Sequence, residues 1–170
     1  MTPADGRLTV TGEVAEIAFD RHLAHPVDVV WAALTAAADL AIWLGPGTLE
    51  PREGGRVSIR TGPSSQPGRQ RVMSGRILAW DPPHVLEHEW RQPGLDVSVV
   101  RYELEPVSGG TLLRFTHRRS VKPGATGGRA GWHAYLDRLA AHLDGRPVPA
   151  WARRRAEVQD AYGEAPISGA

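Results

Sequence analysis

Two histidines and a tyrosine occupy alternating stretches of the sequence, where a β-strand would turn them toward one face. In "HVLEHEW", His88 shares its parity with apolar residues on either side. Because alternate residues of a strand point to the same face, these neighbours predict that His88 faces the interior. The same pattern predicts inward positions for Tyr102 in "DVSVVRYELEP" and for His117 in "TLLRFTHRR".

These three polar groups have two competing interpretations. An imidazole or a phenol inside an apolar pocket can orient a ligand, or can act as a general acid or base on an enolisable substrate. Interior polar groups can also do no more than satisfy one another or a water molecule. The sequence leaves both interpretations open.

Other common chemistries find no support in the residue spacing. The seven histidines form neither a His-x-x-x-His pair nor an HExxH motif, and His133 and His142 fall on opposite sides of one helix. "GATGGRAG" lacks the GxxxxGK[ST] pattern of a phosphate-binding loop, so we expect a flexible hinge there. No GxSxG motif occurs, and neither Ser98 nor Ser120 has an evident base partner. We therefore expect no metal and no cofactor.

The composition is that of an ordinary globular protein, and it excludes several functional classes. With 41% apolar residues, 23% charged residues and a net charge of +1, the chain has no basic surplus that would favour a nucleic-acid partner. It has no cysteine, which excludes disulfides and thiolate chemistry. No secretory signal pattern and no run of ~18 apolar residues occurs, so we predict a cytoplasmic protein without a membrane span. The "RRR" run (Arg153 to Arg155) is interpreted as a solvated helix face.

Apolar periodicity predicts the elements that must position these side chains. A strand is expected over 13–25, a helix with Pro26 in its first turn, and a second short helix over 37–45. From there to residue 119 the period is two, which predicts six short strands in an antiparallel meander. Tight turns join these strands, except for a polar, Gly/Pro-rich hairpin loop expected over 61–71.

A long C-terminal helix is expected over 131–145, with Trp132 and Leu136 in its apolar stripe and Gly145 at its end. Each apolar face must be covered, so we predict an α+β fold in which a strongly curved antiparallel sheet of about six or seven strands wraps around this helix. The expected division is a flexible N-terminus over 1–12, one domain over 13–145, and a tail over 146–170 with one short helix.

The order of these elements is typical of one superfamily. Together with "DLAIWLGPG", "REGGRV", "GRILAWDPPHVLEHEW", "GGTLLRFTHR" and "GWHAYLDRLAAHLDG", it resembles the SRPBCC or START-like superfamily with its Bet v-like helix-grip fold. Within it, the sequence is most similar to bacterial domains that resemble the C-terminal domain of the heat-shock-protein ATPase activator. The resemblance implies a pocket for an apolar or aromatic small molecule between the sheet and the C-terminal helix. It supplies no invariant catalytic set, so only the place of the pocket carries over.

Three functional hypotheses follow. The leading one is a small-molecule binding domain rather than an enzyme. The first alternative is an enzyme resembling polyketide cyclases and aromatases, and the second is a co-chaperone-like partner of a heat-shock ATPase. Trp151 and Tyr162 are expected to dock the tail on the body or across a homodimer. The predicted ligand-binding residues are Trp43, Ile59, His88, Trp90, Tyr102, His117, Trp132 and Leu136.

Overall fold

The computed structural model describes residues 5–63, 70–121 and 128–164. Within them, the strands form an eight-stranded antiparallel sheet in the order β1-β2-β8-β7-β6-β5-β4-β3. The strands are β1 (Arg7–Thr11), β2 (Val14–Leu23), β3 (Gly47–Leu49), β4 (Arg56–Pro63), β5 (Gln70–Asp81), β6 (Val85–Trp90), β7 (Ser98–Val107) and β8 (Gly110–Ser120). The helices are α1 (Val27–Thr35), α2 (Ala37–Trp43), α3 (Arg129–Leu143), α4 (Trp151–Gln159) and the 3-10 helix η1 (Asp160–Tyr162).

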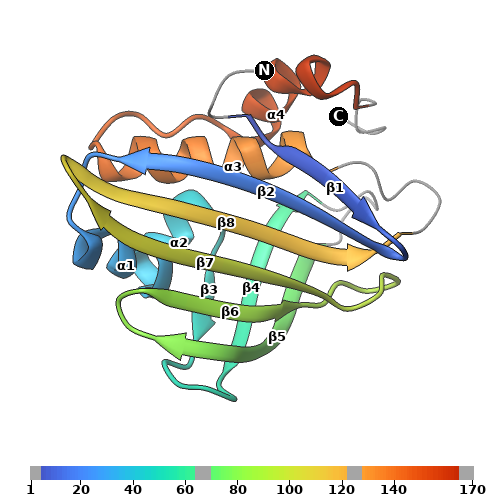
Figure 1. Cartoon of the computed structure of the whole chain (residues 1–170), viewed down its shortest axis with the longest axis horizontal. Coiled ribbons are helices and arrows are strands. Elements are labelled where there is room, and N and C mark those ends of the chain that lie inside the picture. The colour runs from blue at the N-terminus through green and yellow to red at the C-terminus, as the bar shows by residue number, and fades with distance from the viewer. Residues whose placement is uncertain (1–4, 64–69, 122–127, 165–170) are drawn as a thin grey trace.

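The sheet is strongly curved, and α3 packs against its inner face. Figure 1 shows β3 and β4 running across the direction of β7 and β8. Inner-face residues of the strands, such as Phe19 and Phe115, form one apolar core with Trp132, Leu136 and Leu139 of α3. This arrangement confirms the predicted α+β fold, in which a curved antiparallel sheet holds the long C-terminal helix.

The helix ends follow local rules. Pro26 lies just before α1, where its missing N–H costs nothing, and Asp28 adds a carboxylate to the first turn. After α3, Gly145 has a φ of 64°, and the N–H of Arg146 donates to the carbonyl oxygen of Ala141 over 2.9 Å. This is a Schellman motif, so the predicted role of Gly145 at the helix end is confirmed. None of the helices in the described ranges is long and apolar enough to cross a membrane.

The main departure from the sequence-based expectation is β1. Residues 7–11 were expected to be flexible, yet they pair with β2 from Arg7 opposite Ala18 to Thr11 opposite Val14. Most side chains of β1 are exposed. Leu8 and Val10 do alternate with polar residues, but the pattern spans only five residues and only Leu8 packs against the core, so this edge strand gives a weak periodic signal. With β1, the sheet has eight strands among the described residues rather than six or seven.

The strands around the predicted hairpin loop are also longer than expected. Strand β4 continues to Pro63 and β5 starts at Gln70, whereas the loop was expected over 61–71. Residues 64–69 themselves, and residues 124–127 of the predicted "GATGGRAG" hinge, lie outside the described residues. Residues 129–131 of that segment are not a hinge but the first residues of α3.

The C-terminal tail is docked on the body of the same chain. The indole N–H of Trp151 donates to the carbonyl oxygen of Gly131 over 3.1 Å, and the hydroxyl oxygen of Tyr162 accepts from the backbone N–H of Gly6 over 2.8 Å. The carboxylate of Glu164 accepts backbone hydrogen bonds at the N-terminus of α3. These contacts confirm the docking role predicted for the two aromatic residues.

Candidate ligand-binding site

The inner faces of β6, β7 and β8 meet α3 in a buried cluster of aromatic rings and histidines. His88 and Tyr102 are each 2% exposed, and Trp90 and His117 are each 7% exposed. The strand parity predicted from the sequence is therefore confirmed. Cross-strand pairing keeps the set together, since His88 lies opposite Val100, which in turn lies opposite His117 on β8.

Trp132 of α3 is the centre of the cluster. Its ring centroid lies 5.0 Å from that of Trp90, 4.3 Å from that of Phe115 and 5.8 Å from that of His117. Tilted and edge-to-face pairs of this kind add to the free energy gained by burying the rings. Helix and sheet thus share one set of packed rings, called here the aromatic wall. It consists of His88, Trp90, Tyr102, Phe115, His117 and Trp132.

A chain of hydrogen bonds runs through this wall and fixes the protonation of His117. The indole N–H of Trp132 donates to Nδ1 of His117 over 2.9 Å. An indole nitrogen can only donate, so Nδ1 carries no proton and the proton of the neutral ring lies on Nε2. Nε2 donates to Oγ of Ser98 over 2.8 Å, and Ser98 donates to the carbonyl oxygen of Trp90 over 3.0 Å. Burial lowers the pKa of His117 to about 3, so the ring is uncharged at neutral pH.

Ser98 corrects one expectation from the sequence. It was expected to lack a base partner, but it lies within hydrogen-bond distance of His117. The tautomer nevertheless excludes activation of the hydroxyl, because a general base would need its lone pair on Nε2, and that atom carries the proton. Both ring nitrogens of His117 and the hydroxyl group of Ser98 already have hydrogen-bond partners, so the pair is a structural contact.

His88 has the opposite tautomer. Its Nδ1 donates to the carbonyl oxygen of Glu89 over 2.8 Å, so in the neutral ring Nε2 keeps a lone pair. Burial lowers the pKa of His88 to about 4, so the ring is neutral under ordinary conditions. Burial also raises the pKa of Tyr102, which keeps its hydroxyl protonated.

The remaining predicted ligand residues lie in the same apolar core but use their surfaces for packing. Trp43 is fully buried, and its indole N–H donates to the carbonyl oxygen of Ala33 over 2.8 Å, which joins α2 to α1. Ile59 on β4 and Leu136 on α3 are buried core residues. Contact of any of the eight predicted residues with a ligand stays a prediction.

Several residues of the cluster were absent from the predicted set. Phe115 and Ser98 could have been included, because Phe115 shares its strand parity with His117 and Ser98 shares its parity with Tyr102. Tyr135 lies at the edge of the α3 stripe, 5.7 Å from Trp132 between ring centroids, and the ring of Trp151 stacks on it at 5.4 Å. No periodic signal connects Trp151 to this site, because it reaches the site from the tail.

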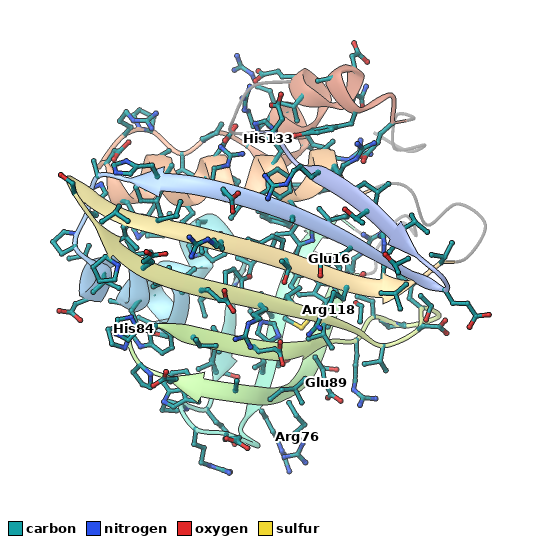
Figure 2. The ribbon with its side chains drawn as sticks, in the orientation of Figure 1. Glu16, Arg76, His84, Glu89, Arg118 and His133 are labelled. Carbon is teal, nitrogen blue, oxygen red and sulfur yellow. The ribbon has the colours of Figure 1, made fainter. Side chains whose placement is uncertain are left out.

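A second polar cluster lies under the tail, around His133 on α3, which Figure 2 labels. Nδ1 of His133 lies 2.7 Å from the hydroxyl oxygen of Tyr162, and Nε2 lies 3.3 Å from Asp137. Asp137 also accepts from Arg21 over 2.9 Å and from Arg154 over 2.6 Å. This phenol, imidazole and carboxylate set resembles a catalytic triad in composition only. Each member holds the tail to the body, so the cluster is structural.

Charged side chains gather on the outer face of the sheet. Glu87 lies 3.1 Å from Arg118 and 3.3 Å from Arg101, which forms a charged network across β6, β7 and β8. Figure 2 labels Arg118 on β8 and Glu16 on β2, which both line a hollow on this face. Among the described residues, no group of three or more histidine and acidic side chains is arranged to hold a metal ion.

Comparison with known proteins places the chain in a family. The model of the family "Activator of Hsp90 ATPase homolog 1-like protein" matches residues 24–144. The crystal structure of CalU16 from Micromonospora echinospora has 28% identity and a TM-score of 0.71, covering 97% of this chain and 96% of CalU16. The structure of MLL2253 from Mesorhizobium loti has 26% identity and a TM-score of 0.66, covering 78% of this chain and 98% of MLL2253. No curated protein matches the chain. The predicted resemblance is confirmed, and the chain belongs to the family of Activator of Hsp90 ATPase homolog 1-like proteins.

Proposed function

We propose that this protein binds an apolar or aromatic small molecule between the inner face of the curved sheet and α3. The observation that carries the proposal is a set of polar atoms without a partner in the aromatic wall. Among the described residues, Nε2 of His88, Nε1 of Trp90 and the hydroxyl oxygen of Tyr102 have no hydrogen-bond partner. Their side chains are buried but the three atoms are not fully enclosed, so they can pair with water or with a ligand that enters the wall.

Family membership supports a ligand-binding domain in general. The side chains of the wall support an apolar or aromatic ligand, because most of the wall is aromatic and only a few polar atoms are available to orient the ligand. Small-molecule sites are commonly built in this way.

The proposal can be tested with the indole N–H signals of the tryptophans in a two-dimensional nitrogen–proton NMR spectrum. Titration with 2-naphthol should shift the signals of Trp90 and Trp132. The signals of Trp31 and Trp80 are the internal control, because these two rings pack on each other at 5.1 Å outside the wall. Signals would be assigned from single tryptophan-to-phenylalanine variants. Shifts confined to the control pair, or no shift at saturation, would contradict the proposal.

Binding is a better account of the site than catalysis. A general base works best when its pKa lies near the working pH, and burial holds the pKa of His88 at about 4. The raised pKa of Tyr102 likewise makes its hydroxyl a weak acid. If the protein were instead a cyclase-like enzyme, Tyr102→Phe would abolish turnover while leaving the fold intact.

The family match over residues 24–144 motivates a second candidate, interaction with a heat-shock ATPase. The measurement is the ATP hydrolysis rate of a purified heat-shock ATPase with and without an excess of this protein. A rate increase that survives the His88→Phe substitution would favour this role and separate it from ligand binding. An unchanged rate would rule it out for that ATPase.

A further inference from the structure

The three unpartnered atoms belong to rings that form a row along β6 and β7. The ring centroid of His88 lies 6.3 Å from that of Trp90 and 6.3 Å from that of Tyr102, so the imidazole is the middle member. All three side chains are at least nine-tenths buried. None of the three atoms is among the fully enclosed polar atoms that lack a partner, so a group of solvent size can reach each of them.

The three atoms differ in hydrogen-bonding capacity. The Nδ1–H of His88 donates a hydrogen bond to the carbonyl oxygen of Glu89, which leaves Nε2 as an acceptor. The indole N–H of Trp90 can only donate, and the phenol of Tyr102 can donate or accept. An acceptor between two donors complements a hydroxyl group, because a hydroxyl both donates and accepts a hydrogen bond.

The row carries no formal charge at neutral pH. Burial keeps His88 unprotonated and Tyr102 protonated. Burial also lowers the pKa of the neighbouring His117, which accepts the indole N–H of Trp132 at its unprotonated Nδ1, so this ring is neutral too. The positive charge of Arg119 acts on His117, but the negative charge of the Glu164 carboxylate acts on Arg119 in turn. An ionised ligand would therefore lose its hydration without a dedicated counter-ion in the row.

We propose that the ligand is an uncharged aromatic compound with a hydroxyl group, which donates to Nε2 of His88 and accepts from Tyr102 or Trp90. This inference rests on the proposed function and adds the chemical class of the ligand. Its aromatic ring lies against the same wall, where ring contacts give binding free energy, and the hydroxyl group fixes its orientation.

The test is calorimetric titration at neutral pH with three probes of one ring system. These are 2-naphthol, 2-methoxynaphthalene, which keeps the ring and the oxygen but has no proton to donate, and 2-naphthoate, which is anionic. At this pH 2-naphthol is uncharged, because phenols lose their proton near a pKa of about 10. Binding of 2-naphthol should be about tenfold tighter than that of either other probe, as expected for one good hydrogen bond in a buried site.

The matched variants are His88→Phe and His84→Phe. The first removes the acceptor and keeps a flat ring, so 2-naphthol and 2-methoxynaphthalene should then bind equally. The second makes the same substitution outside the row, at a side chain that bonds the carbonyl oxygen of Leu104, and should keep the tenfold preference. If circular dichroism shows that His88→Phe is unfolded, His88→Leu takes its place, because it also removes the acceptor and should likewise abolish the preference. Tyr102→Phe removes a donor to the ligand oxygen, so it should weaken the binding of both probes and keep the preference between them.

The possible outcomes separate the two proposals. Equal binding of 2-naphthol and 2-methoxynaphthalene by the unmodified protein would overturn the hydroxyl assignment while leaving ligand binding intact. Tighter binding of 2-naphthoate would overturn the assignment of an uncharged ligand. Absence of binding by all three probes at their solubility limits would overturn both this inference and the proposed function.

Discussion

Acid should destabilise this protein through its two neutral core histidines. Burial lowers the pKa of His88 to about 4 and that of His117 to about 3, whereas a histidine in an unfolded chain titrates near ~6.5. Below that pH the unfolded chain binds protons that the folded chain does not. The free energy of unfolding is therefore fully retained above about pH 7 and is lost as the pH falls toward the folded pKa values.

The size of the effect follows from these pKa values. Between about pH 7.5 and pH 5, each histidine should remove about 2 kcal/mol from the free energy of unfolding, and the two together about 4 kcal/mol. This is a large share of a typical net stability of roughly 5–15 kcal/mol. Asp137 does not interfere in this range. Burial raises its pKa, but hydrogen bonds from His133 and Arg154 outweigh that effect and hold the pKa at about 2, so the carboxylate stays ionised.

The measurement is urea unfolding followed by tryptophan fluorescence at several pH values in this range. His88→Phe should halve the fall in the free energy of unfolding, because only one titrating core histidine remains. The same substitution at the exposed His22 is the control and should keep the full fall. A free energy that stays level or rises toward pH 5, or a His88→Phe variant that falls as steeply as the unmodified protein, would refute the reasoning.

Three further perturbations test the packing. Trp132→Phe removes the N–H that donates to His117 and leaves a buried acceptor unpaired, which should cost about 1–3 kcal/mol in urea unfolding. Gly45→Ala would place a methyl group 1.8 Å from the carbonyl oxygen of Arg60, a backbone atom that cannot move aside. It should cost about 3 kcal/mol and lower the melting temperature by roughly 6–12 °C in calorimetry. Glu164→Gln weakens the carboxylate cap on α3 and should cost about 1 kcal/mol, seen as faster hydrogen exchange in the first turn of that helix.

The inner faces of the sheet could be predicted from the sequence because β6, β7 and β8 are buried on one side only. Apolar residues at alternate positions then fix the orientation of the polar ones, so His88, Tyr102 and His117 were placed correctly. The apolar stripe of α3 was recognisable for the same reason, with Trp132 and Leu136 on the buried side.

The contacts within the site could not be predicted. The bond between Ser98 and His117 depends on the register of β7 against β8, in which Ser98 lies diagonal to His117, two residues from its direct partner Val100. No local pattern encodes that register. Strand β1 was missed because its alternation is only five residues long and only Leu8 is partly buried. The stacking of Trp151 on Tyr135 depends on how the tail folds back.

The hydrogen bond between Gly6 and Tyr162 brings the entry to the first strand next to the last helical turn. The chain could therefore pass through the same elements in a different sequence order while their arrangement in space stays the same. A circular permutant that joins the two ends by a short linker, and begins instead in the turn between β6 and β7, would keep every neighbour in the sheet. That turn is exposed, with Leu95 at 67% exposure, so opening it breaks no core contact. Such a chain would start at β7 and end at β6, with its new termini beside the aromatic wall.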